Sequence, residues 1–482
     1  MKFIRPILYT FISMLLLSAT AQDEVTIYFA PGNYLPMEAT ETMPNPPTAL
    51  TALVEEYEAM HPGVNIEFVE IPENVSGDTW RVTVFQGGNQ PHILPNNYIR
   101  VWQEEINEWY LPLNDYLTMP NPYTPEGTPG SEAWQDSIPE VVWETTLHSG
   151  GNQYLVTVDA VAVGMFFNKE MLEEAGVSSE FAIDTSLWPD WATMLTDMET
   201  LKGTGVEPVA LSMSTATPYN YNWIDGVALT SVYRDSVESM FKPDTPWHAM
   251  SQEEGACAIE NGLMSANDPQ FSDFIDILSG FEPYWIEGYT SASPDEAYRL
   301  FINGEVPFLV ANAAADMDRV LRDTDFEFGV SYFPPITGAT SEHAANVENS
   351  FLVGGFTSGF TVTERAEREG IAEQVVDFLM YVTAQPQWSE VVTDAPRAVP
   401  TLVGLDVPDA LVPLTGFLEL PIRAFKDPDP RLTKRYGEEH RRLMQEFFTG
   451  QIDKEALIQA EDRLMTREAA KVIAENSWSC DY

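Results

Sequence analysis

The stretch "VAVGMFFNKEMLEEAGV" at Val161–Val177 decides the fold, because it joins a strand to a helix with almost no turn between them. Its first half is an uninterrupted apolar run, which is typical of a strand buried on both faces in a parallel sheet. Its second half has helical spacing, with Met171 and Leu172 on the side that would pack on the sheet. Asn168 stands where a helix N-cap belongs, and Gly176 stands where a left-handed residue ends a helix. We therefore predict a strand that passes directly into a helix at Asn168.

The strand extends upstream through "QYLVTVDA", where Asp159 alone interrupts the β-prone run. A charged residue inside such a run is rarely buried without a reason, so Asp159 either caps a bend or faces a cleft. Nearer the N-terminus, the alternating strand "EVTIYFA" precedes a helical pattern over 48–61 and a second strand, Val64–Ile71. Strand, helix and strand in this order indicate a βαβ unit and a parallel sheet. The predicted fold class is α/β.

Length and charge narrow the classes of function. The chain has 482 residues, of which 44% are hydrophobic, and this length favours two lobes over a single core. Acidic residues outnumber basic ones 74 to 25, giving a net charge of −49. Nucleic acids and anionic lipids need clustered Lys and Arg, so we expect neither as a partner. The acidity is typical of a solvated surface that keeps a protein soluble.

The first residues have the form of a secretory signal. Lys2 and Arg5 precede a short apolar run that ends in the small-residue sequence "ATA" at Ala21. We predict a cleaved signal over residues 1–21 and an exported mature chain, and no Cys follows the run to carry a lipid anchor. In an oxidising compartment, Cys257 and Cys480 could form one disulfide.

Motifs for catalysis are missing from the sequence. The six histidines are scattered, and there is no HExxH, GxSxG, phosphate loop or GxGxxG after a strand. We therefore expect neither a metal site nor a cofactor. A carboxylate pair for glycoside hydrolysis could be imagined among 74 acids, but that abundance makes the signal uninformative.

Aromatic residues beside polar turn residues recur instead. Aromatic faces stack on the apolar faces of sugar rings, and asparagine amides match sugar hydroxyls as donors and acceptors. Two of the clusters directly follow predicted strands, where ligands bind in parallel sheets. Each cluster could equally be a simple turn. The clusters consist of Asn33 and Tyr34; Asn96, Asn97 and Tyr98; and Tyr219, Tyr221 and Trp223.

Six segments in order resemble one known family, the extracellular solute-binding proteins of carbohydrate ABC transporters, of the maltodextrin-binding type. The resemblance covers nearly the whole mature chain. His92 replaces the family's usual Asp, a proline expected near Thr157 is absent, Ala313–Ala315 replace a customary Trp, and a loop over Pro120–Trp134 is extra. The six segments are "ALTALVEEYEAMHPGVNIEF", "GGNQPHIL", "GGNQYLVTVDAVAVGMFFNKEMLEEAGV", "LWPDWATMLTDMETLKGTGVEPVAL", "AYRLFINGEVPFLVANAAADMD" and "VVDFLMYVTAQPQWSEVV".

The resemblance implies a periplasmic-binding-protein-like type II fold, with two α/β lobes, a hinge that the chain crosses several times, and a ligand cleft between the lobes. On this pattern the first lobe comprises 22–158 and 354–407, and the second comprises 159–353 and 408–482. Both cysteines then fall in the second lobe.

Family positions that face the cleft can be carried over residue by residue. In the first lobe these positions are the two clusters that follow strands, which are Asn33 and Tyr34, and Asn96, Asn97 and Tyr98. Asp159 lies at the first hinge crossing. Tyr219 and Trp223 match an aromatic wall of the second lobe, and Tyr436 matches a late aromatic contact. The chain re-enters the first lobe at Gly354, Gly355 and Phe356.

The resemblance implies binding without chemistry. We expect a small-molecule carbohydrate, an oligosaccharide, to be captured by hinge closure and delivered to an ABC transporter permease. We expect a monomer without a cofactor. Two alternatives stay open, an exported carbohydrate-active enzyme such as a glycosidase and a binding protein for a non-sugar solute such as glycerol phosphate. An anionic ligand needs Arg or Lys, and because the clusters contain none we expect a neutral ligand.

Overall fold

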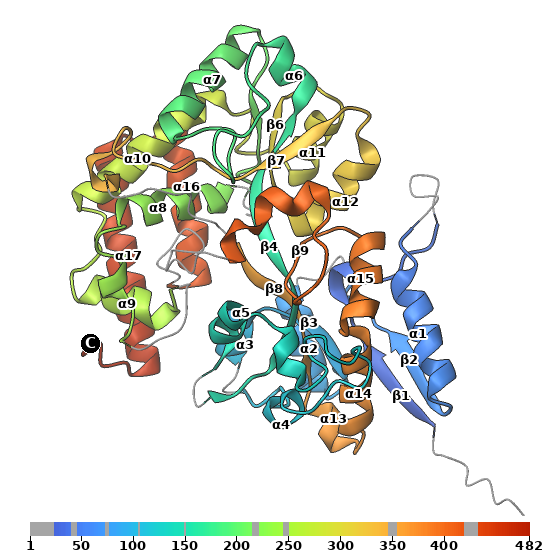
Figure 1. The fold of residues 1–482 in the computed structure, drawn as a ribbon. Coiled ribbons are helices and arrows are strands. Elements are labelled where there is room, and N and C mark those ends of the chain that lie inside the picture. Colours follow the sequence, from blue (N-terminus) through green and yellow to red (C-terminus); the bar gives the residue numbers. More distant parts are fainter. Residues whose placement is uncertain are drawn as a thin grey trace, which may run out of the picture.

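The computed structural model describes residues 24–39, 46–72, 77–104, 107–148, 151–214, 221–243, 250–345, 354–418 and 432–482. Figure 1 shows two bodies of helices and strands, one above the other, with β4 (Leu155–Asn168) running from one body into the other beside β8 and β9. The predicted signal at residues 1–21 lies outside the described residues.

The described strands form one sheet in the order β2-β1-β3-β8-β4-β6-β5, and β7 and β9 also pair with β4. Pairs β1–β2, β1–β3 and β5–β6 are parallel, whereas every pair that includes β4 or β8 is antiparallel. The remaining strands are β1 (Val25–Phe29), β2 (Val64–Phe68), β3 (Ile93–Asn96), β5 (Val209–Ala210), β6 (Phe308–Asn312), β7 (Phe328–Ser331), β8 (Gly354–Val362) and β9 (Val399–Pro400).

The predicted βαβ unit is confirmed. Strands β1 and β2 pair in parallel from Val25 opposite Val64 onward, and α1 (Ala49–Met60) connects them. The N-terminus of α1 is capped from far along the chain, because the Asp394 carboxylate accepts the backbone N–H groups of Thr48 and Ala49 at 2.6 and 2.8 Å. A carboxylate at this end of a helix pairs with otherwise unsatisfied N–H groups and with the helix dipole.

The prediction that β4 lies in a parallel arrangement is wrong. Its N-terminal part pairs antiparallel with β8 and its C-terminal part pairs antiparallel with β6 and β7. Burial on both faces was predicted correctly, since Val163, Met165 and Phe166 are all completely buried. A continuous apolar run requires only that both faces be covered, and a central antiparallel strand between two layers of helices satisfies that condition too.

The junction between strand and helix forms as predicted. The side chain of Asn168 accepts the backbone N–H of Met171 at 3.1 Å and caps α6 (Lys169–Glu174). Gly176 follows the helix with φ of +73°, the left-handed conformation that glycine adopts readily. Leu172 is completely buried against the sheet.

We expect the Asn168→Ala variant to lose about 1 kcal/mol of stability, because the cap removes one unsatisfied N–H from the start of α6. Urea denaturation followed by circular dichroism measures the loss. Asn168→Ser is the matched control, since it keeps an uncharged capping oxygen at this buried position and should unfold closer to the wild type. Equal losses in both variants would contradict the capping role.

One hydrophobic core, here called the N-terminal core, contains β1–β3 and lies around Phe29, Leu53, Val156, Phe360 and Trp388. The helices of the same body are α1 together with α2 (Gly77–Gly87), α3 (Tyr98–Glu104), α4 (Asn114–Leu117), α5 (Glu140–Thr146), α13 (Arg365–Arg368), α14 (Ala372–Val382) and α15 (Gln385–Asp394).

A second core, here called the C-terminal core, lies around Phe166, Trp191, Phe274, Phe308 and Met444. Its helices are α6 together with α7 (Trp191–Gly203), α8 (Tyr221–Val232), α9 (Gln252–Glu260), α10 (Pro269–Phe281), α11 (Pro294–Ile302), α12 (Ala313–Asp323), α16 (Lys434–Phe448) and α17 (Lys454–Asn476). Strand β4 contributes to both cores, with Val156 in one and Phe166 in the other. The predicted lobe boundaries after residues 158, 353 and 407 stay predictions.

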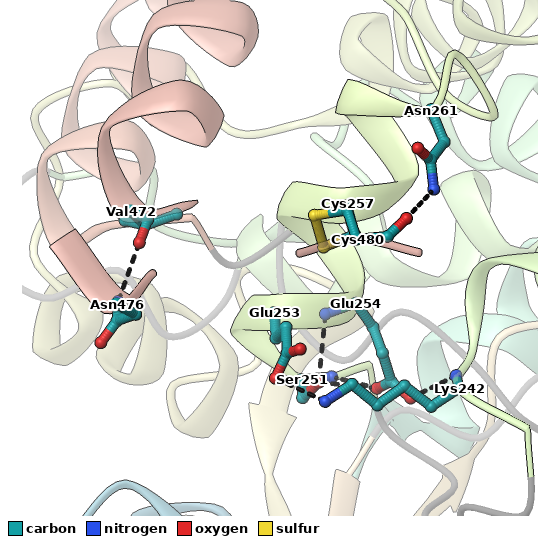
Figure 2. The surroundings of a disulfide bond; sticks show 9 residues. All are labelled: Lys242, Ser251, Glu253, Glu254, Cys257, Asn261, Val472, Asn476 and Cys480. Atoms are coloured by element: carbon teal, nitrogen blue, oxygen red, sulfur yellow. Dashed lines mark hydrogen bonds and ion pairs between the residues drawn. A yellow bond between two sulfur atoms is a disulfide. The ribbon is translucent and has the colours of Figure 1, made fainter. Parts of the chain in front are cut away.

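A disulfide joins Cys257 of α9 to Cys480, just beyond the end of α17 (Figure 2). Asn261, the C-cap residue just beyond α9, donates from Nδ2 to the Cys480 carbonyl at 3.0 Å and so holds the same tail. Both sulfurs are largely buried, with residue exposures of 0% and 7%.

Candidate ligand-binding site

A depression opens at the sheet edge where β1 and β3 end. The strands are parallel, and Phe29, the last residue of β1, lies opposite Ile93, the first residue of β3. Strand β3 therefore continues past the end of β1 in the same direction, and the depression lies on the carboxyl side of both strands, as in other α/β binding sites. The 3-10 helix η1 (Gly32–Tyr34) follows β1, and Asn96 is the last residue of β3. The depression measures about 700 Å³ including space open to solvent, and its polar lining comes from Asn33, Tyr34, Arg81, Asn96, Asn97 and Arg100.

Close approach of η1 to the end of β3 depends on glycine. Gly32 has φ of +63°, and a Cβ atom at this position would lie 2.9 Å from the Cβ of Pro95. Only glycine combines this backbone conformation with so short a contact. The sequence "PGNY" therefore brings Asn33 and Tyr34 to the same place as the end of β3.

The two asparagines at the end of β3 are held by their own hydrogen bonds. Asn96 is 3% exposed, and its Oδ1 accepts the backbone N–H of Asn97 at 3.0 Å. The Oδ1 of Asn97 accepts the backbone N–H of Arg100 at 2.8 Å, which places the Asn97 amide at the start of α3. Because these bonds fix both amides before any ligand arrives, little side-chain entropy is lost on binding.

Tyr34 is positioned by Asp159. The Tyr34 hydroxyl donates to Oδ2 of Asp159, and its ring packs edge-on against Trp388 with 5.0 Å between ring centroids. Burial raises the pKa of Tyr34 well above its ordinary value and the Asp159 carboxylate raises it further, so the hydroxyl stays protonated as a donor. Asp159 itself is 0% exposed and lies at a register shift of β4 opposite Ser358 and Pro400. It therefore reaches the depression through Tyr34.

Two arginines that the sequence did not indicate, Arg81 and Arg100, also line the depression. The expectation of a neutral ligand, which came from clusters without Arg or Lys, stays a prediction. Arg81 is on α2, and its guanidinium binds the Glu104 carboxylate of α3 at 2.8 and 3.3 Å and the Pro95 carbonyl at 3.3 Å. It also donates to the Tyr110 hydroxyl. Arg81 and Glu104 come together only in the folded chain, and no local spacing in the sequence signals such a pair.

Other predicted site residues lie away from the depression. Tyr98 is 2% exposed in the N-terminal core, while Tyr221, Trp223 and Tyr436 are 0%, 8% and 3% exposed in the C-terminal core. Gly354 and Gly355 pair with Ala162 and Val161 in the β4–β8 ladder, and the backbone of Phe356 continues β8. Tyr219 lies outside the described residues. A ligand-binding role for these residues stays a prediction.

Around Tyr221 and Tyr436 lies a buried ionic cluster. The His440 imidazole of α16 contacts the Glu461 carboxylate of α17 at 2.9 Å and the Asp225 carboxylate of α8 at 3.5 Å. All three residues are at most 1% exposed, and the Tyr436 ring stacks on His440 with centroids 5.8 Å apart. One imidazolium thus joins three helices of the C-terminal core.

Two specific possibilities, a metal site and a serine nucleophile, can be checked among the described residues. Within the described ranges, no group of three or more His, Cys, Asp or Glu side chains could hold a metal ion. Ser341 and His343 both bind Asp273, so the serine hydroxyl points to the carboxylate and not to the imidazole. A nucleophilic serine needs the opposite arrangement, in which the imidazole accepts its proton.

The model of the bacterial extracellular solute-binding protein family matches residues 41–383 of the chain, more than half of its length. The chain belongs to this family. The predicted resemblance is therefore confirmed, and with it the exported character of the family. None of the helices in the described parts of the chain is long and apolar enough to span a membrane. No curated protein sequence matches the chain.

Solved structures with the same fold align with almost the whole of this chain. A chitin oligosaccharide binding protein is 18% identical with a TM-score of 0.64, covering 92% of this chain and 98% of its own. RafE in complex with raffinose is 14% identical with a TM-score of 0.64, covering 92% and 100%. The sugar-binding protein MalE from Xanthomonas citri is 14% identical with a TM-score of 0.63, covering 94% and 100%. These likenesses confirm the predicted periplasmic-binding-protein-like type II fold.

Proposed function

We propose that this solute-binding protein captures a carbohydrate outside the cytoplasm and delivers it to the membrane permease of an ABC transporter. The observation that carries the proposal is the convergence of Asn33, Asn96, Asn97 and Tyr34 on one depression at the ends of β1 and β3. Amide and hydroxyl groups pair with sugar hydroxyls as donors and acceptors. The depression contains no catalytic constellation, which supports binding over chemistry.

Structures of similar fold support a carbohydrate as the ligand class. Those proteins bind chitin oligosaccharide, raffinose and α-D-tagatose, and a further one prefers β-D-galactopyranose. The range runs from single sugars to oligosaccharides, so the proposal is for the class and not for one sugar. We propose further that the chain acts as a monomer and that residues 1–21 are its cleaved export signal.

A neutral ligand remains the better match to the depression, although arginines line it. The Arg81 guanidinium is only 4% exposed and already pairs with the Glu104 carboxylate. A cation neutralised in this way contributes donors without a net charge for an anion. In a chain with net charge −49, an anionic solute would also approach against the overall field.

Capture would follow from closure of the two bodies around the ligand. Polar groups of the N-terminal body would hold the sugar hydroxyls, and the C-terminal body would cover the sugar from the other side. The closed form would be the one that the permease recognises, because only that form reports a bound ligand.

The direct test is calorimetry of the purified mature chain against a panel of neutral mono- and oligosaccharides, with uronates, glycerol phosphate and amino acids as the comparison set. We expect heat of binding and a raised melting temperature with at least one neutral carbohydrate. Binding confined to amino acids or glycerol phosphate would refute the sugar assignment. Release of smaller sugars during incubation would refute the assignment as a binding protein.

For the sugar that binds, we expect Asn33→Ala to weaken the affinity about tenfold, the cost of one lost hydrogen bond to a buried hydroxyl. Asn33 is exposed, so its removal should leave the melting temperature of the free protein unchanged. Asn303→Ala makes the same chemical change at an exposed position that follows α11, and it should bind like the wild type. Equal affinities of all three proteins would place the ligand elsewhere.

A further inference from the structure

One ion pair ties the two bodies together. The Arg397 guanidinium and the Asp318 carboxylate approach to 3.0 Å, with side chains only 13% and 15% exposed. Asp318 is on α12, whose Met317 and Val320 pack in the C-terminal core. Among the ion pairs between described residues, the others join elements of the same body. The contact is therefore suited to controlling how the bodies sit relative to each other.

Arg397 belongs to the segment that connects α15 with β9. On one side of it, Trp388 and Val391 of α15 pack in the N-terminal core; on the other, Val399 packs in the C-terminal core. Strand β9 then pairs with the middle of β4, with Val399 opposite Ala160. Arg397 thus lies where the chain passes from one core to the other, and a change in the angle between the bodies must change its surroundings.

The pair is incompletely satisfied in this arrangement. Oδ1 of Asp318 and Nε of Arg397 are buried, and neither has a hydrogen-bond partner among the described residues. A bidentate arginine–carboxylate pair would use both of these atoms. The single contact suits a tie that can form and break as the bodies move, because a fully satisfied buried pair would cost far more to separate.

Tyr34 connects Arg397 to the depression. Tyr34 and Arg397 line one small pocket together with Leu50 and Val391. Burial and Asp159 raise the pKa of Tyr34, and the Arg397 charge acts against them, as expected of a cation nearby. On its other side Tyr34 lines the depression. Tyr34 therefore lines both the depression and the small pocket next to the residue that makes the tie between the bodies.

We propose that Arg397 is a positioning residue whose ion pair with Asp318 sets the relative orientation of the two bodies and couples it to Tyr34 and Asp159 at the depression. The pair adds a favourable contact to one orientation only, and a contact made in one state alone shifts the population toward that state. Loss of the pair frees the bodies to populate other orientations. This inference concerns the free protein and does not require the proposed ligand.

Single-molecule energy transfer between the two bodies tests it. Dyes are attached at cysteines introduced in place of the exposed residues Glu174 of α6 and Glu144 of α5, which lie in different bodies in Figure 1. The native cysteines are both in the disulfide, so only the introduced thiols react. The comparison is between the wild type, Arg397→Gln and Asp318→Asn, all without ligand.

We expect both variants to change the ratio of orientations by about fivefold or more, seen as a broadened or second distance population. Arg397→Lys keeps the positive charge, so its distance distribution should be close to that of the wild type. Arg319→Gln is the matched control. Arg319 lies next to Asp318 on α12, is partly exposed, and pairs with Asp295 at 3.2 Å, so its replacement removes an arginine from this helix without touching the pair with Arg397. It should leave the distribution unchanged.

Two results would overturn the proposal. One is a wild-type distance distribution in both Arg397→Gln and Asp318→Asn, and the other is an equal change in Arg319→Gln. Because the two variants break the pair from opposite bodies, misfolding of one of them, detected by circular dichroism, leaves the other as the test. Failure of every sugar to bind would refute the proposed function and would leave this result standing.

Discussion

Replacement of His440 by glutamine is expected to lower the free energy of unfolding by about 3–5 kcal/mol. His440 lies between the carboxylates of Asp225 and Glu461, and none of the three residues is more than 1% exposed. Removing the imidazolium takes away the cation that lies between the two buried carboxylates, and among the described residues only the charge of Arg441 then still acts on Asp225. Glutamine fills a similar volume and can still donate one hydrogen bond, so the effect measures the charge more than the packing. Urea denaturation at neutral pH gives the value.

The dependence on pH distinguishes this explanation from a simple packing defect. Burial alone would lower the pKa of His440, but the two carboxylates overcome that effect and raise it to about 10. An unfolded histidine titrates at about 6.5, so the folded state holds the proton more tightly. The contribution is complete below about pH 6.5 and is lost as the pH rises towards 10. The difference between wild type and His440→Gln should therefore shrink between neutral pH and about pH 10.

A surface histidine provides the control for His440. His343 contacts Asp273 at 2.8 Å, but their side chains are 24% and 29% exposed. His343→Gln should cost less than about 1 kcal/mol, because water replaces the lost contact. A similar small loss in His440→Gln, or a difference that does not change with pH, would mean that the cluster is not charged as described.

Removal of the disulfide is expected to have the second largest effect. The Cys257→Ala/Cys480→Ala double variant should lose about 2–5 kcal/mol, because the bond closes a long loop in the unfolded chain. The two cysteines are 223 residues apart in sequence. In the folded state the bond fastens the tail beyond α17 to α9, beside the hydrogen bond from Asn261 (Figure 2). Thermal unfolding with and without a reducing agent measures the loss.

The reducing agent also supplies the control for the disulfide. Dithiothreitol should lower the melting temperature of the wild type to about that of the double variant, and it should leave the double variant unchanged. If reduction shifts neither protein, the two thiols do not form a bond in solution. If it shifts both, the agent acts on something other than this disulfide.

Local features were predictable from the sequence, and features that depend on distant contacts were not. The junction at Asn168 was predicted because strand pattern, cap residue and helix pattern all lie within one short segment. The pairing direction of β4 was missed because burial on both faces looks the same in parallel and antiparallel sheets. Pairing partners are set by segments far along the chain, and the apolar run itself does not reveal them.

The same distinction holds for the candidate site. Asn33 and Asn96 were predicted from their places directly after strands, since parallel strands bring such residues to one edge. Arg81 was missed because its place depends on how α2 packs beside α3. The burial of Tyr221 and Trp223 in the C-terminal core was also not evident from the sequence, because an aromatic residue beside asparagines has the same local pattern whether it packs in a core or faces a ligand.

The cap on α1 has a consequence for the order in which the chain can fold. The first helix of the N-terminal core receives its capping carboxylate from Asp394, and β8, α14 and α15 belong to the same body. A growing chain therefore cannot complete this core until most of its residues have been synthesised. The late completion of this core is compatible with the exported character of the family, because a core that has not yet closed does not oppose passage of the chain in extended form.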